Sequence, residues 1–151
     1  MPQSLSDVNL HIIFSTKDRY PFLDHEIRDR MHRYLATICR DLKSVCYKVG
    51  GVSDHVHVVT TLPRTLSQSS LLEEIKNKSS KWIKEIDDAK YGKFSWQSGY
   101  GSFSVSKSNL DEVLRYVSNQ EEHHRKRNFQ DEYRSFLTKH EVNIDERYVW
   151  D

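Results

Sequence analysis

The chain has 151 residues with a formal net charge of +1, and 36% of its residues are hydrophobic while 30% are charged. That length fits one ordinary domain, residues 1–151, and the composition is typical of a globular protein, which excludes a disordered chain. No apolar run approaches the roughly 20 residues of a membrane-spanning helix, and the start MPQSLSDVNL lacks the features of a signal peptide. We therefore expect a cytoplasmic protein with no membrane partner.

The first part of the chain predicts a strand, a helix and a hairpin. NLHIIFST, residues 9–16, alternates apolar side chains between two faces, as a strand does. Residues 24–42 carry apolar side chains at helical spacing, with Asp24 as the N-cap. Residues 44–51 and 55–62 are two β-rich runs separated by the turn-prone GGVSD, which indicates a hairpin.

The middle of the chain predicts a second helix and a fourth strand. Residues 69–86 have an apolar stripe, and Ser70 with Glu73 forms a capping-box pattern at the start. Residues 94–107 are aromatic, alternating and interrupted by two glycines, which predicts a strand with a bend or bulge.

Two further helices are predicted after this strand. One spans residues 108–126 and starts at Ser108, with Asp111 completing a capping pattern, and a short one spans residues 129–140. The order strand, helix, strand, strand, helix, strand indicates an α+β fold: a ferredoxin-like or RRM-like antiparallel sheet with helices on one or both faces, plus C-terminal helices. In that topology the first and third strands are central.

The third predicted strand carries the motif SDHVHVV, in which two histidines are one residue apart. Because strand side chains alternate, His55 and His57 share one face of the sheet. Imidazole is a common ligand of divalent transition metals, so the pair forms a partial metal site. The alternative is two partly buried histidines that are hydrogen-bonded to their neighbours.

The predicted helix over residues 108–126 carries polar groups on one side. Tyr116 and Gln120 are four residues apart and share a helical face, and His123 and His124 follow close to the same stripe. Tyr116 adjoins the apolar stripe, so its phenol can reach a cleft. The alternative is an ordinary boundary tyrosine with a hydrated hydroxyl.

SDHVHVV together with LRYVSNQEEHHRK resembles the HUH superfamily (His, hydrophobic residue, His), specifically the single-tyrosine transposases of small bacterial insertion sequences and the related repeat-associated tyrosine transposases. HIIFSTKDRYPFL, IKNKSSKWI and WQSGYGSFSVS support the resemblance, which covers nearly the whole chain.

The resemblance implies a divalent metal, magnesium or manganese, bound by His55, His57 and Gln120, and a nucleophile at Tyr116. It implies attack of the tyrosine on single-stranded DNA, giving a 5′-phosphotyrosine and a free 3′-hydroxyl. Substrates in the family are hairpin-forming element ends, and its members are homodimers whose active site is assembled within one subunit or between two. The sequence does not decide between these arrangements.

The residue types suit this chemistry independently of the family. A phenol with a pKa near 10 is mostly protonated at neutral pH, so it needs an activated phosphate and a route for its proton. Two imidazoles are unusual for magnesium and favour manganese, zinc or nickel. The chain has no G-x-x-x-x-G-K-[ST] loop, which agrees with a reaction that needs no nucleotide cofactor.

Other polar residues are candidates for supporting roles. Asp54 is a candidate to orient the imidazole of His55, because metal-bound histidines usually have such a partner. Candidate DNA contacts are Lys17, Lys76, Lys78, Lys81, Arg125 and Lys126. The alternative for these cations is that they are solvated on exposed faces.

Two other functions compete with the transposase. A two-histidine phosphoesterase requires a repeated His-x-Thr/Ser pattern, but His55 is followed two residues later by another histidine, and His11 is followed by Ile13. A catalytically inactive or regulatory hairpin-DNA-binding module would keep the fold and bind DNA without forming an adduct.

Overall fold

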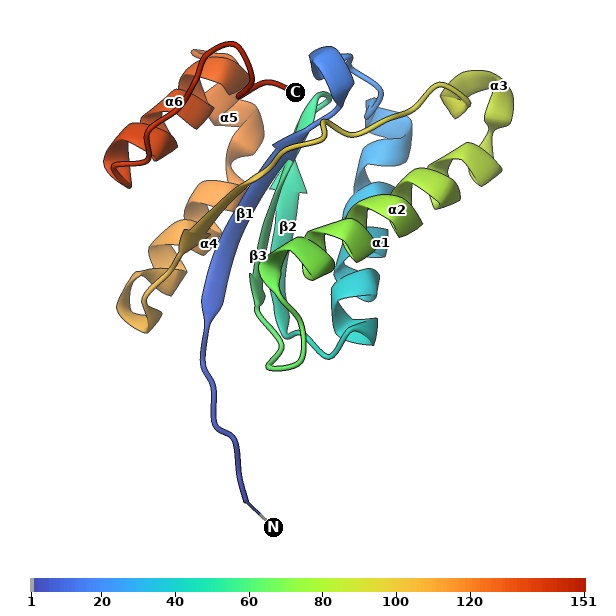
Figure 1. Cartoon of the computed structure of the whole chain (residues 1–151). Coiled ribbons are helices and arrows are strands. Elements are labelled where there is room, and N and C mark those ends of the chain that lie inside the picture. The colour runs from blue at the N-terminus through green and yellow to red at the C-terminus, as the bar shows by residue number, and fades with distance from the viewer. Residues whose placement is uncertain (1) are drawn as a thin grey trace.

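The computed structural model describes residues 2–151, which form an α+β fold with one antiparallel sheet between two layers of helices (Figure 1). The strand order is β2-β3-β1-β4, so the first and third strands are central, as predicted. The strands are β1 (Asn9–Ser15), β2 (Cys46–Gly51), β3 (His55–Thr61) and β4 (Gly101–Ser104). The helices are α1 (His25–Asp41), α2 (Gln68–Ile86), α3 (Asp88–Tyr91), α4 (Leu110–Ser118), α5 (Gln120–His124) and α6 (Phe129–Lys139), with 3₁₀ turns at Lys17–Arg19 and Lys107–Asn109.

Helices α1 and α2 cover one face of the sheet and enclose the main apolar core (Figure 1). Asp24 caps α1 as predicted, because its side chain accepts a hydrogen bond from the Ile27 amide at 3.2 Å. The sheet contributes to this core the side chains of Leu10, Ile12, Phe14, Val56 and Val58. No helix within residues 2–151 combines the length and the apolar character needed to cross a membrane.

The predicted N-cap of α2, Ser70, is wrong by three residues. Ser67 is the N-cap, with extended backbone angles (φ −77°, ψ 164°), and its hydroxyl accepts from the Ser70 amide at 3.1 Å. Ser70 is already inside the helix, so the Ser70–Glu73 capping box does not form.

The predicted strand over residues 94–107 is mostly not a strand. Only Gly101–Ser104 pairs with β1, and Trp96 makes one isolated bridge. The Lys76 ammonium donates to the carbonyls of Gln97, Ser98 and Gly99 at 2.9, 3.2 and 2.6 Å. These carbonyls therefore bind a side chain instead of a neighbouring strand.

The predicted single helix over residues 108–126 is also wrong, because it is divided at Asn119. This residue has φ −106° and ψ 28°, and it separates α4 from α5. Ser108 lies in the preceding 3₁₀ turn, and Asn109 precedes α4 without a capping side-chain hydrogen bond, so the Ser108–Asp111 pattern caps nothing.

Helices α4, α5 and α6 cover the opposite face of the sheet (Figure 1). Two glycines on the edge strands allow a close approach. A Cβ atom at Gly50 on β2 would lie 2.5 Å from the carbonyl oxygen of Val117 on α4. A Cβ atom at Gly101 on β4 would lie 2.6 Å from the ring of Tyr133 on α6. The space between these two contacts contains the histidines of β3.

Candidate metal centre

Strand β3 presents His55 and His57 to the face covered by the C-terminal helices, and both side chains are fully buried. Pairing with β1 sets their positions, because His57 lies opposite Ile13 and His55 opposite Ser15. A strand at the centre of a sheet is held on both sides, so the two imidazoles have a rigid base.

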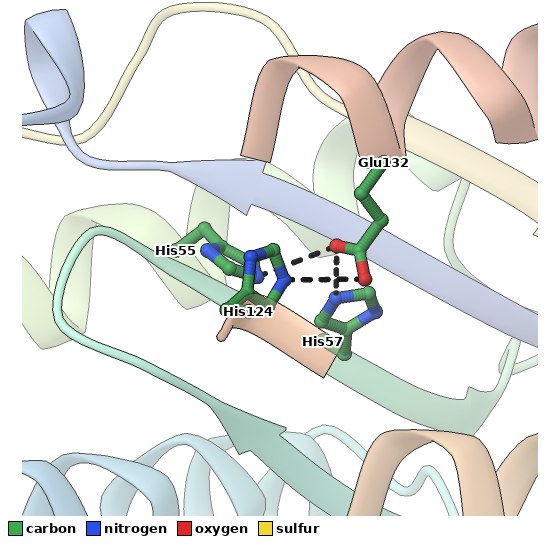
Figure 2. Close-up of side chains that lie close together, drawn as sticks. All are labelled: His55, His57, His124 and Glu132. Carbon is green, nitrogen blue, oxygen red and sulfur yellow. Dashed lines mark hydrogen bonds and ion pairs between the residues drawn. The ribbon is translucent and has the colours of Figure 1, made fainter. Parts of the chain in front are cut away.

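Two further side chains meet these histidines from the C-terminal helices (Figure 2). Glu132 on α6 lies with one carboxylate oxygen 2.9 Å from His57 Nε2 and 3.4 Å from His55 Nε2. Its other oxygen lies 3.2 Å from Nε2 of His124, which comes from α5. The four residues offer one ligand atom each, and these atoms lie within 4.8 Å of one another.

The structure brings Gln120, a predicted metal ligand, to the edge of this cluster. Its side chain is buried, and its carbonyl oxygen lies 3.1 Å from His55 Nε2 and 3.1 Å from His124 Nε2. Three imidazoles, a carboxylate and a carboxamide oxygen therefore converge from β3, α5 and α6.

Tyr116, the predicted nucleophile, contacts the cluster through the carboxylate of Glu132. Its hydroxyl donates a hydrogen bond to Oε2 of Glu132. Its ring stacks on His123 with centroids 4.4 Å apart and meets Phe136 edge-on at 5.6 Å. The phenol oxygen is thus held beside the convergent donors.

Each histidine of β3 has a partner behind it. Asp54 Oδ1 lies 2.8 Å from His55 Nδ1, where the sequence predicted an orienting carboxylate. His11 Nε2 lies 2.7 Å from His57 Nδ1, and both rings are buried. Sequence reasoning missed His11. Its alternation within β1, on the same face as His57, is the signal that points to it.

Burial and hydrogen bonding give the two β3 histidines different protonation states. Burial lowers the pKa of His57 to about 4, so this imidazole is neutral at pH 7. Burial also acts to lower the pKa of His55, but hydrogen bonds to Asp54 and Glu132 outweigh it and raise that pKa to about 9. His55 is therefore an imidazolium that pairs with two carboxylates.

The charges of Glu132 and Tyr116 follow from the same contacts. Burial acts to raise the pKa of Glu132, yet hydrogen bonds to His124, His55 and His57 hold it far below its usual range. Burial, together with the negative charge of Glu132, raises the pKa of the Tyr116 phenol. At neutral pH the phenol is protonated and donates to an ionised carboxylate.

The donor set fits a divalent transition metal. Imidazole and carboxylate groups suit manganese, zinc, iron or nickel, whereas magnesium prefers oxygen donors and retains several waters. Of the two predicted ions, manganese matches these side chains better. Metal binding at His55 must release its proton, because a ligating imidazole is neutral.

The six predicted DNA-contacting cations do not gather at this cluster. The Lys76 ammonium donates to three carbonyls, and burial lowers its pKa to about 8. Lys78 pairs with Glu74 and Arg125 with Glu122. The remaining three of the six, Lys17, Lys81 and Lys126, are exposed and form no ion pair within residues 2–151.

Comparisons with known proteins agree with this fold. A crystal structure of a putative transposase from Deinococcus radiodurans is 18% identical, with a TM-score of 0.62, over 80% of this chain and 96% of that chain. A REP-associated tyrosine transposase bound to a REP hairpin is 16% identical, with a TM-score of 0.54, over 79% of this chain and 72% of that chain. A search of curated proteins found no match.

The family model described as Transposase IS200 like matches residues 4–120. The match includes His55, His57, Tyr116 and Gln120. It ends before His124 and Glu132. It covers well over half of the chain. This protein therefore belongs to the IS200-like transposase family.

Proposed function

We propose that this transposase cuts and rejoins single-stranded DNA at insertion-sequence ends by metal-assisted tyrosine transesterification, with Tyr116 as the nucleophile. One observation carries the proposal. The Tyr116 hydroxyl is hydrogen-bonded to the carboxylate that also contacts His55, His57 and His124. A nucleophile and a set of metal donors are thus adjacent within one chain.

His55, His57, His124 and Glu132, with Gln120 beside them, would hold the divalent metal. Such an ion supplies Lewis-acid polarisation of the phosphate and stabilises negative charge on its oxygens. Asp54 and His11 orient the two β3 imidazoles through their Nδ1 atoms.

Tyr116 performs the bond exchange in this proposal. Its oxygen forms a bond to phosphorus as the bond from phosphorus to the 3′ oxygen breaks. The phenol loses its proton in this step, and the departing 3′ oxygen takes up a proton, so the exchange is balanced. The products are a 5′-phosphotyrosine and a 3′-hydroxyl. Because the number of phosphate ester bonds is conserved, attack by a 3′-hydroxyl reverses the step without a nucleotide cofactor.

The burial of the cluster also has a role. Glu132, His55 and His57 are fully buried and Tyr116 is half-buried, so protein side chains shield the reacting groups from much of the bulk solvent. Exclusion of water protects a phosphotyrosine from hydrolysis and leaves it for strand rejoining.

We propose hairpin-forming single-stranded DNA as the partner, which is supported by the hairpin bound to the similar REP-associated tyrosine transposase. The homodimer implied by the resemblance stays a prediction. Tyr116 and the histidines already meet within one chain, so we propose that cleavage does not require a second subunit to complete the site.

The test is adduct formation with single-stranded oligonucleotides that cover the flanks of the gene, with magnesium, with manganese or with neither. We expect a covalent protein–DNA band on a denaturing gel that requires metal and disappears in Tyr116→Phe and His57→Ala. Tyr148→Phe is the matched control, because Tyr148 is an exposed tyrosine outside the cluster.

Binding of these oligonucleotides without any adduct, under every metal, would contradict the catalytic proposal. It would favour the alternative of a hairpin-binding module. An adduct that persists in Tyr116→Phe would assign the nucleophile to another residue.

A further inference from the structure

A cavity of about 300 Å³ lies beside Tyr116, between β4, α4 and α6. Its walls are mostly apolar or aromatic. Phe103 stacks on His140 with centroids 4.6 Å apart and on Phe136 at 5.6 Å. Val105 and Val113 complete the apolar lining, and Tyr116 and His11 close the side next to the metal donors.

The rim of this cavity carries polar side chains that are not committed elsewhere. Among residues 2–151, the side chains of Arg127, Lys139 and Asn109 make no hydrogen bond or ion pair, and all three are exposed. The nearby Arg134, by contrast, forms an ion pair with Glu146 at 2.9 Å. One acid, Glu112, also lines the rim, so the cations exceed the carboxylates.

We infer that this cavity receives the base of a nucleotide adjoining the phosphate that Tyr116 attacks. The inference rests on the proposed function, because it assumes that a DNA strand passes Tyr116.

The position, size and chemistry of the cavity support the assignment. Tyr116 belongs both to the cavity wall and to the metal cluster, so a strand whose phosphate reaches the phenol has its neighbouring nucleoside at the cavity. The volume is at the lower end of the roughly 300–1,000 Å³ of ligand sites, which suits one nucleoside. Aromatic walls stack on a base, while Arg127 and Lys139 can contact the adjoining phosphates.

The test uses the four deoxynucleoside 5′-monophosphates as probes, without metal and without catalysis. We expect saturable amide chemical-shift changes by NMR around Val113, Ser135 and His140, which line the cavity. 2-Deoxyribose 5-phosphate, which has the phosphate but no base, should bind at least tenfold more weakly.

Three variants and one control localise the binding. Val113→Phe fills the cavity and should weaken nucleotide binding at least tenfold, while Arg127→Ala and Lys139→Ala should each weaken it severalfold. These two rim residues are exposed, so their variants should fold even if Val113→Phe does not. Lys93→Ala is the control, because Lys93 is an exposed cation that does not line the cavity.

The outcomes separate this inference from the proposed function. Equal binding of 2-deoxyribose 5-phosphate, or shifts that avoid the cavity, would overturn the base site even if the Tyr116 adduct forms. Base-dependent binding that Arg127→Ala and Lys139→Ala weaken would support it even if no adduct is found.

Discussion

The part of the chain matched by the family and the segment that follows it contribute differently to the candidate site. Residues 4–120 supply the sheet, the two histidines of β3, Tyr116 and Gln120. Residues 121–151 supply His124 and Glu132, and α6 carries the Phe136 ring that packs against His57 and Tyr116. The nucleophile therefore belongs to the matched part, while its hydrogen-bond acceptor belongs to the segment beyond it.

This difference shows that a site can be divided between the common part of a fold and an added helix. The matched part alone offers two imidazoles and a carboxamide. The added segment contributes a third imidazole and the negative charge, which change the donor set toward the transition metals.

The largest expected effect is the loss of metal affinity in the Glu132→Ala variant. The substitution removes the one carboxylate among the convergent donors, so the affinity for Mn²⁺ should fall at least about 100-fold. Loss of a residue that only orients a metal ligand costs about 10- to 100-fold, and loss of a ligand itself should cost more. Isothermal titration calorimetry measures this, with the exposed neighbour Asp131→Asn as control. Unchanged affinity would mean that the metal does not need the Glu132 carboxylate.

The His11→Leu variant tests the contact between His11 and His57, two residues that both belong to the matched part. Leucine cannot hydrogen-bond to His57 Nδ1, so Mn²⁺ affinity should fall about 10- to 100-fold. His11→Gln keeps an acceptor and should restore most of the affinity, which a purely steric role would not predict. Equal affinities for the leucine and glutamine variants would disprove the orienting role.

Gly50→Ala tests the contact that positions α4 on the sheet. The added methyl would lie 2.5 Å from the Val117 carbonyl, so α4 must move, at a cost of about 2 kcal/mol in the free energy of unfolding. Urea denaturation measures this cost. Gly99→Ala is the matched control, because its nearest contact is 3.2 Å, and it should cost clearly less.

The smallest expected effect concerns His32 on α1, far from the added segment in the sequence. Burial lowers its pKa from 6.5 to about 4, and its Nε2 has no hydrogen-bond partner within residues 2–151. The unfolded chain binds this proton first, so stability is lost as the pH falls from 6.5 to 4. His32→Gln should lose less stability than the wild type over this range.

Denaturant titrations at several pH values measure the stability difference between the two proteins. A difference that does not change with pH would show that His32 is protonated equally in the folded and unfolded states.

Much of the fold was predictable because period-two and helical spacing are local properties of the sequence. The strands of residues 9–15 and 55–61 and the Asp24 cap follow from such patterns. The irregular start of the predicted fourth strand does not follow from such a pattern, because Lys76, twenty or more residues away, binds the carbonyls of Gln97, Ser98 and Gly99.

The candidate site was predictable only in part. His55, His57, Tyr116 and Gln120 stand in recognisable motifs, and the structure brings all four together. Glu132 has no such motif, and it reaches the cluster only because the chain turns between α5 and α6. His124 was interpreted as one of the polar residues of a continuous helix, whereas the break at Asn119 separates it from α4.

The contacts of residues 150 and 151 determine which end of the chain can carry a label. The carbonyl of Asp151 accepts from the Gly99 amide at 2.8 Å and from Gln97 Nε2 at 3.3 Å, and Trp150 packs against Tyr133 of α6. A fluorophore or affinity handle placed there would compete with the contacts that hold α6 over the sheet. Residues 2–8 are exposed and extend away from the sheet (Figure 1), so labelling at that end leaves Glu132 and its helix undisturbed.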